Sequence, residues 1–249
     1  MDDAQLLRYS RHILLTELGP DAQDKFGAAH ALVVGVGGLG NPAAHFLAAT
    51  GIGKLTLCDA DHVDLTNLQR QILYATPDIG RAKVDAAAAR LAAINPDVRI
   101  DQVATRVGAA ELAPLVAKAD VVLDCTDNFV TRHAINRACV AAGKPLVSGA
   151  ALRFDGQIAV FDVRSPDSPC YHCLFGEGDE LEETRCATMG VFAPLVGIVG
   201  ATQAGEALKL IAGVGETLAG RLLILDALTM QWRDVRVPRD PACPVCASR

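Results

Sequence analysis

The sequence predicts an α/β fold, with a doubly wound, Rossmann-like parallel sheet that is continued by a smaller mixed or antiparallel half. Short apolar runs alternate with Ala-rich helical stretches over roughly the first 150 residues, and a glycine-rich turn follows the first of these runs. After that point the apolar runs become longer and a single long helical pattern lies between them. Continuous apolar strands separated by helices are typical of a parallel sheet covered on both faces.

Each predicted element follows from a local pattern. Residues 1–28 form an amphipathic helical arm, whose buried side is supplied by Leu6, Leu7, Ile13, Leu14 and Leu18. Runs rich in Val, Ile and Leu predict strands over 31–35, 55–59, 98–103, 121–124 and 145–148. The Ala-rich stretches between them predict helices over 42–50, 81–94, 109–118 and 129–142. In the second half we expect strands over 157–163, 221–227 and 231–237, a helix over 197–211 and an irregular acidic stretch over 176–183.

Composition narrows the class of protein. The chain has 249 residues, 51% of them hydrophobic, which is enough to bury a large core. Its start lacks the basic and apolar regions of a signal peptide, and no apolar run approaches the roughly 20 residues that span a bilayer, so we expect a cytoplasmic protein without membrane contact. Eight cysteines in that reducing compartment argue against a disulfide framework, and a net charge of −6 argues against nucleic acid as a partner.

The stretch "VVGVGGLG" carries the first signal of a binding site. Gly35, Gly37 and Gly40 fit a G-x-G-x-x-G phosphate turn between a strand and a helix, and Gly38 adds a further glycine. Without a Cβ, the main-chain N–H groups can approach a phosphate closely, and a helix N-terminus favours negative charge. Asp59 ends the next strand, where a carboxylate can accept hydrogen bonds from ribose hydroxyls. Alone, this motif fits NAD, FAD, an adenine nucleotide or a turn without a ligand.

Charged residues further along the chain favour ATP. Arg70 and Lys83 follow Asp59, and "LDCTDN" brings Asp127 and Asn128 to the carboxyl end of a predicted strand, the edge at which doubly wound sheets bind ligands. A dehydrogenase needs little positive charge beyond its pyrophosphate turn. An ATP-using enzyme must neutralise a triphosphate and hold Mg²⁺, for which Lys, Arg and Asp are suited.

Two cysteine pairs predict a structural zinc site. Cys170 and Cys173 form one Cys-x-x-Cys pair, and Cys243 and Cys246 form another after 69 intervening residues. Four thiolates in two such pairs match a tetrahedral Zn²⁺ site, which would tie the C-terminal tail to the region near residue 170. A redox-active Cys-x-x-Cys is the alternative interpretation, but it gives the second pair no role.

The chain resembles the MoeB/ThiF family, the bacterial relatives of the ubiquitin-activating enzymes, over nearly its whole length. The resemblance rests on eight motifs in the family's order: "RYSRHILL", "GVGGLG", "NLQRQI", "LDCTDN", "PLVSGAA", "GQIAVF", "CYHC" and "CPVC". It implies a single domain over 1–249, with a helical arm (1–28), a nucleotide-binding half (29–150) and a carrier-binding and zinc half (151–249). It also implies an ATP-dependent adenylyltransferase that activates the C-terminal glycine carboxylate of a ubiquitin-like β-grasp sulfur-carrier protein ending in Gly-Gly.

The resemblance also assigns roles to the nucleotide-binding residues. Asp59 would hold the ribose, while Asn67, Arg70 and Lys83 would hold the phosphates and Asp127 the magnesium ion. The chemistry is one in-line displacement between two anions, so positioning and charge neutralisation should supply most of the rate without a general base.

Two further residues receive roles only from the resemblance. Arg11 would reach the nucleotide of the other subunit of a homodimer. Cys186 lies where some members of the family form a persulfide linkage with the activated carrier. Because the sequence ends three residues after Cys246, without the rhodanese domain that several relatives carry, we expect the sulfur to come from a separate donor protein.

Several alternatives stay open. The carrier can belong to molybdopterin synthesis (MoaD-like) or to thiamine synthesis (ThiS-like), and "PLVSGAALRFDGQIAVF" favours the first. A NAD-dependent oxidoreductase shares the glycine turn, and a zinc-stabilised binding module without catalysis would share only the cysteines. A tRNA-modifying dehydratase is a further relative, but the chain has no basic patch of the kind that RNA requires.

Overall fold

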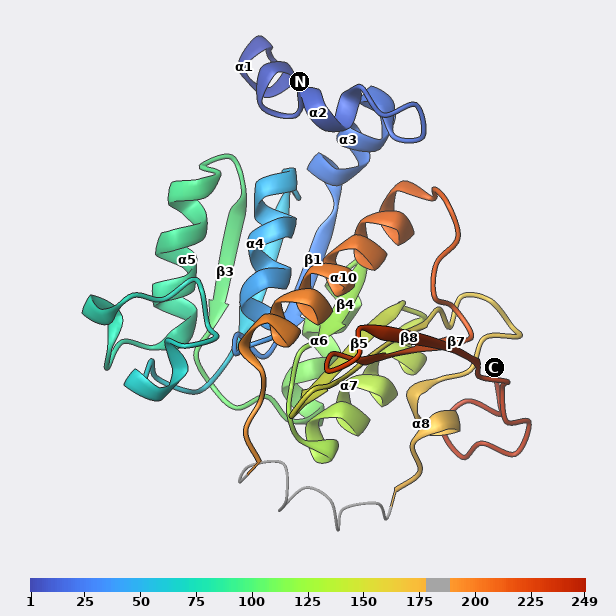
Figure 1. Cartoon of the computed structure of the whole chain (residues 1–249). Helices are drawn as coiled ribbons and strands as arrows, with labels where there is room; N and C mark the ends of the chain where they lie inside the picture. Colours follow the sequence, from blue (N-terminus) through green and yellow to red (C-terminus); the bar gives the residue numbers. More distant parts are fainter. Residues whose placement is uncertain (178–188) are drawn as a thin grey trace.

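A computed structural model describes residues 1–177 and 189–249, and within these residues the strands form one eight-stranded sheet between helical layers (Figure 1). The strand order is β3-β2-β1-β4-β5-β6-β7-β8. The strands are β1 (His30–Val34), β2 (Lys54–Cys58), β3 (Arg99–Val103), β4 (Val121–Asp124), β5 (Leu146–Leu152), β6 (Asp155–Phe161), β7 (Arg221–Asp226) and β8 (Gln231–Arg236).

The helices of the described residues agree with the sequence pattern in place and order. They are α1 (Asp3–Arg8), α2 (Ser10–Ile13), α3 (Gly19–Ala28), α4 (Gly40–Thr50), α5 (Lys83–Ile94), α6 (Ala109–Lys118), α7 (Phe129–Ala142), α8 (Tyr171–Leu174) and α10 (Ala193–Ala212), with 3-10 turns η1 (Leu65–Asn67) and η2 (Thr76–Asp78).

The parallel half is covered on both faces, as its continuous apolar strands predict. In β1, Ala31 and Val33 join a buried cluster with residues of α4, α5 and α10, whereas Leu32 and Val34 join a second cluster with residues of α6 and α7. Successive residues of a strand point to opposite faces of the sheet, so a strand buried on both faces must be apolar throughout. The doubly wound architecture is therefore confirmed.

The antiparallel continuation is also confirmed. Strands β5 to β8 pair antiparallel in sequence order. Strand β5 runs to Leu152, beyond the predicted end at residue 148, because β6 returns beside it after a tight turn in which Arg153 has a φ of +52°. The local sequence "GAAL" has little β propensity, so this extension comes from pairing between the strands.

Helix α10 is long and apolar enough to cross a membrane by length and composition, in contrast to the expectation that no apolar run of the chain approaches that length. More than half of that apolar window is buried inside the fold. Its buried residues, including Leu195 and Val199, join the cluster that covers one face of the sheet. The core helix of a soluble protein passes the same test of length and composition.

The N-terminal arm lies at the amino-terminal ends of the parallel strands (Figure 1). The ring of buried Tyr9 packs against Gly51, which precedes β2, and its hydroxyl accepts a hydrogen bond of 2.9 Å from Nδ2 of Asn95, which precedes β3. The arm then leads through α3 directly into β1, whose other end opens into the glycine turn. Five residues of strand, about 16 Å, separate the two ends of β1.

Candidate functional site

The glycine turn closes tightly between β1 and α4. Gly35 has a φ of +88°, and its N–H donates to the Cys58 carbonyl at 2.8 Å. A Cβ on Gly40 would lie 1.9 Å from the Gly35 carbonyl oxygen, so only glycine fits there. Around Gly37, in contrast, the nearest atom to such a Cβ would be 3.7 Å away, and a Cβ on Gly38 would press on Val196 of α10 at 3.2 Å. The turn therefore offers main-chain N–H groups at the start of a helix, as a phosphate site requires.

This turn lies at the point where the strand order reverses. β1 pairs with β2 on one side and β4 on the other, and the chain beyond β4 runs on to β5. A Cβ on Gly35 would lie 2.7 Å from the Cys125 carbonyl oxygen, so the loop after β4 touches the glycine turn. Asp127 is exposed in that loop, and Asn128 caps α7 by accepting from the Thr131 N–H at 2.9 Å. Doubly wound sheets bind their ligands in the crevice at such a switch point.

Asp59 and Lys83 lie at the same edge, beside the glycine turn. Asp59 accepts hydrogen bonds from the N–H groups of Val36 at 2.8 Å and Asp61 at 2.9 Å. Burial raises the pKa of the Asp59 carboxyl, while the charge of Lys83 and these two N–H donors oppose the rise. The side chain of Lys83 is nearly buried, and its Nζ lies 2.9 Å from an Asp61 oxygen. Asp61 itself is largely exposed, so Lys83 can exchange its ion pair with Asp61 for one with a more strongly charged anion.

The remaining predicted residues make local contacts or lie elsewhere. Asn67 closes a 3-10 turn by accepting from the Asp64 N–H at 3.1 Å, and Arg70 donates to the Thr66 carbonyl at 3.0 Å. Arg11 is exposed on α2, in the arm at the opposite end of the strands from the glycine turn. Cys186 lies outside the described residues.

Sequence reasoning missed two polar residues that hold the glycine turn. Buried Asn41 donates from Nδ2 to the Val36 carbonyl at 2.7 Å and accepts from the Leu73 N–H at 2.7 Å. The Tyr74 hydroxyl donates to the same Val36 carbonyl at 2.7 Å. Together they fix the segment after η1 against the turn. An asparagine directly after Gly40, within an otherwise apolar helix, was the available signal.

A third missed residue is Asp124, the last of β4. It is fully buried and accepts from the Thr126 N–H at 3.0 Å, the Thr126 hydroxyl at 2.7 Å and the Ser148 hydroxyl at 2.9 Å. These bonds shape the loop that presents Asp127. The motif "LDCTDN" contains both aspartates, and nothing in the sequence alone distinguishes the buried one from the exposed one.

The four predicted cysteines do come together. The Sγ of Cys170 lies 3.9 Å from that of Cys173 and 3.7 Å from that of Cys243, and the Sγ atoms of Cys173 and Cys246 are 3.5 Å apart. A tetrahedral zinc ion with Zn–S bonds of about 2.3 Å places its sulfur atoms about 3.8 Å apart. The cluster could therefore hold zinc without rearrangement, and each of its members is among the ligands that could bind one ion.

Polar groups from outside the cluster support these thiols. Asn136 of α7 directs Nδ2 to the Cys170 sulfur at 3.6 Å, and Arg239 donates to the Cys246 carbonyl at 2.6 Å. Without a metal, burial raises the pKa of the Cys170 thiol to about 12. Burial also opposes ionisation of Cys246, but hydrogen bonds from the other thiols and Arg239 outweigh it and lower its pKa to about 7. Metal binding would release the protons that remain.

The fold and the site define a class: α/β proteins that bind a nucleotide at the switch point of a doubly wound sheet.

Comparison with known proteins identifies the family within this class. The model of the ThiF family matches residues 9–245. The molybdopterin-synthase adenylyltransferase of Escherichia coli (strain K12) is 45% identical over 249 residues, which cover 99% of this chain and 98% of that protein. The sulfur carrier protein ThiS adenylyltransferase of the same strain is 46% identical over 247 residues, covering 99% and 97%.

A solved structure agrees with these matches. The crystal structure of Escherichia coli MccB with ATP has a TM-score of 0.84 at 25% identity and covers 96% of this chain and 73% of that one. The chain belongs to the ThiF family. The predicted enzyme class, adenylyltransferase, is confirmed by these relatives, and a nicotinamide-dependent oxidoreductase finds no counterpart among them.

Proposed function

We propose that the protein uses ATP to adenylate the C-terminal glycine carboxylate of a small ubiquitin-like sulfur carrier. The observation that carries the proposal is the contact between the glycine turn and the loop after β4, with Asp127 exposed in that loop. This arrangement puts the N–H groups of a glycine turn, which would bind phosphate, next to the loop that carries an exposed carboxylate, in a chain of the ThiF family.

The reaction requires no proton transfer. A carboxylate oxygen of the carrier attacks the α-phosphorus of ATP, the bond from that phosphorus to the bridging oxygen breaks, and pyrophosphate leaves with the electron pair. Asp59 would accept from the ribose hydroxyls, which requires its oxygens to exchange part of their bonding to Val36 and Asp61. Asn67, Arg70 and Lys83 would neutralise and orient the phosphates.

Two metal ions fit this proposal in different ways. Asp127 presents an exposed carboxylate, the oxygen ligand that Mg²⁺ prefers, beside the phosphate turn. Magnesium, when bound there, would offset the charge of the phosphates. The four thiols near residues 170 and 246 would hold zinc as a structural ion, because all four positions are filled by protein ligands and none is left for substrate.

We also propose a homodimer in which Arg11 serves the nucleotide of the partner subunit, and a cytoplasmic location. Arg11 cannot serve its own glycine turn from the opposite end of the strands, so a role in catalysis requires a second chain. The sulfur would come from a separate donor protein, with Cys186 as the residue that could form a persulfide linkage.

The preferred carrier is MoaD-like, from molybdopterin synthesis, with a ThiS-like carrier from thiamine synthesis as the second candidate. The relatives named for the two pathways are 45% and 46% identical to this chain, so sequence identity does not distinguish between the two carriers. ATP–pyrophosphate exchange measured with each purified carrier tests the proposal. Exchange with the MoaD-like carrier alone supports the first choice, exchange with the ThiS-like carrier alone supports the second, and exchange with neither rejects both.

A further inference from the structure

Three side chains near the cysteine cluster also converge. His133 lies on α7 and is buried, His172 lies on α8 between two of the zinc-ligand cysteines, and Glu177 follows α8. One ligand atom of each lies within 4.8 Å of the others. The two imidazole rings meet edge to face, with centroids 5.6 Å apart and an interplanar angle of 64°. These residues come from two parts of the chain that are about 40 positions apart, so only the fold brings them together.

The spacing is close to what a metal ion needs. A tetrahedral Zn²⁺ with bonds of about 2.1 Å to nitrogen and oxygen holds its ligand atoms about 3.4 Å apart. The ligand atoms lie within 4.8 Å of one another, so they must move closer to hold an ion, and exposed Glu177 has more room to rotate than the two histidines. In addition, the Nδ1 atom of His172 is buried and has no hydrogen-bond partner in the described part of the protein. A buried ring nitrogen without a partner is costly, and a metal ion would satisfy it.

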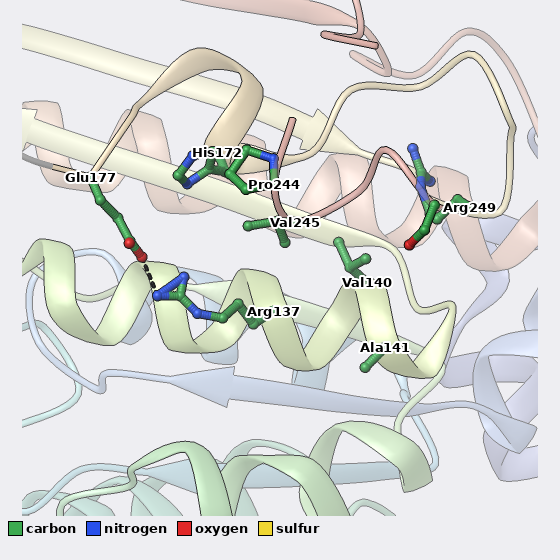
Figure 2. Close-up of a pocket in the computed structure, with 9 residues that line it drawn as sticks. Arg137, Val140, Ala141, His172, Glu177, Pro244, Val245 and Arg249 are labelled. Carbon is green, nitrogen blue, oxygen red and sulfur yellow. Dashed lines mark hydrogen bonds and ion pairs between the residues drawn. The ribbon is translucent and has the colours of Figure 1, made fainter. Parts of the chain in front are cut away.

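The group also borders open space. His172 and Glu177 line a cavity of about 530 Å³ between α7 and the C-terminal tail, whose other walls include Val140, Val245 and Arg249 (Figure 2). No residue of the glycine turn lines this cavity, so it lies away from the proposed nucleotide site. Water from this cavity could reach the ion and fill its fourth position.

One charge opposes the binding of a cation. Arg137 of α7 pairs with a carboxylate oxygen of Glu177, and Figure 2 shows Glu177 reaching down to it beside His172. Both side chains are about half exposed, so this pair is weak and can give way. The second carboxylate oxygen can bind an ion while the first keeps Arg137, but the guanidinium charge must then lower the affinity.

We propose that His133, His172 and Glu177 form a second metal site, for Zn²⁺ or a similar first-row divalent cation, distinct from the four-cysteine cluster. Two imidazoles and one carboxylate are a common set for such ions. The ion would link α7 to the stretch that follows α8. The proposal does not depend on the adenylation reaction, because none of the three residues belongs to the nucleotide site.

The proposed second metal site can be tested by titrating the protein with Co²⁺ after the cysteine cluster has been filled with zinc. The wild-type protein should take up one further equivalent of Co²⁺, with ligand-field absorption but without the intense bands of thiolate-to-cobalt charge transfer. His172→Ala and Glu177→Gln should each lose that equivalent while keeping the zinc of the cluster. His62→Ala, an exposed histidine outside the group, is the matched control and should titrate like the wild type.

The Arg137→Gln substitution should change the metal affinity in the opposite direction. It removes the positive charge and releases Glu177, so the further equivalent should bind severalfold more tightly. His172 is partly exposed, so its replacement is less disruptive than that of buried His133. A wild-type protein that binds no further equivalent, a His172→Ala protein that titrates like the wild type, or unchanged affinity in Arg137→Gln would each overturn the proposal.

Discussion

Asp124 ends β4 and Asp127 lies three residues later in the loop that follows, yet the surroundings of the two carboxylates are opposite. Asp124 is fully buried and accepts three hydrogen bonds, whereas Asp127 is exposed beside the glycine turn. An exposed carboxylate without a structural role is free for a metal or substrate, and a buried one with three donors holds the backbone in shape. The difference gives a direct test of the function proposed for Asp127.

We expect Asp127→Ala to abolish ATP–pyrophosphate exchange and to leave the free energy of unfolding within about 0.5 kcal/mol of wild type, because exposed substitutions rarely affect stability. Asp124→Ala, the matched variant, should instead lower the free energy of unfolding by about 2–3 kcal/mol, since it leaves buried donors without an acceptor. Urea unfolding and the exchange assay measure both. Near-normal exchange by Asp127→Ala would show that its carboxylate is not needed.

The glycine turn offers a second pair of matched substitutions. Gly40→Ala places a Cβ 1.9 Å from the Gly35 carbonyl oxygen, so the turn must shift, at a cost of about 1–3 kcal/mol of stability. Gly37→Ala has space for its Cβ and should keep wild-type stability. Both should weaken ATP binding, the first by distorting the turn and the second by holding phosphate away from the N–H groups. Calorimetric binding together with thermal melting separates the two effects, and tight ATP binding by Gly40→Ala would contradict a phosphate role for the turn.

At the scale of elements, the cysteine cluster joins segments that secondary structure does not connect. α8 and the C-terminal tail meet at the four thiols, and the tail beyond β8 forms no strand or helix in the described residues. Arg249 adds a second attachment, since its guanidinium donates to the Val163 carbonyl at 2.6 Å. The tail is therefore held by side chains and, we infer, by zinc.

Cys243→Ser should release the zinc and lower Tm by on the order of 5 °C or more, because the site would contribute folding energy and about 1 kcal/mol shifts Tm by about 2–4 °C in a protein of this size. Metal analysis and calorimetry measure the two effects. Cys139→Ser, at another buried cysteine, is the control and should keep its zinc. Wild-type protein with much less than one zinc per four of these thiols would count against the site.

At the scale of the whole molecule, the arm and the nucleotide site lie at opposite ends of the same strands. Tyr9 anchors the arm at the amino-terminal ends, while Gly35 and Asp127 lie at the carboxyl ends. The prediction that the leucines of the arm are buried is wrong for Leu6, Leu7 and Leu14, which are exposed and leave an apolar surface there. Such a surface on the arm is consistent with contact between subunits.

This arrangement predicts complementation between two inactive variants. Arg11→Ala and Asp127→Ala homodimers should both be inactive. In a mixed dimer, one site combines the intact Arg11 of one subunit with the intact Asp127 of the other, so activity should recover to about half of wild type per mixed dimer. Subunit exchange verified by a tag, followed by the pyrophosphate assay, measures it. Absence of recovery would mean that Arg11 does not act on the partner's nucleotide and only supports the fold.

Local sequence patterns were enough to predict the strands of the parallel half, the glycine turn, the family and the cluster of four cysteines. These features depend on local patterns, because apolar runs, glycine spacing and Cys-x-x-Cys pairs are each readable within a few residues. The role of Cys186, which lies outside the described residues, and the catalytic roles of Arg11, Arg70 and Lys83 stay predictions.

Which polar groups contact one another could be seen only in the folded protein. It separated buried Asp124 from exposed Asp127, brought Asn41 to the carbonyl of Val36, and joined His133 to His172. The physical reason is that each of these contacts depends on the order of the strands and on the packing of helices across them. A local pattern determines the secondary structure of a segment, whereas the burial and the hydrogen-bond partners of its side chains depend on segments far away in the chain.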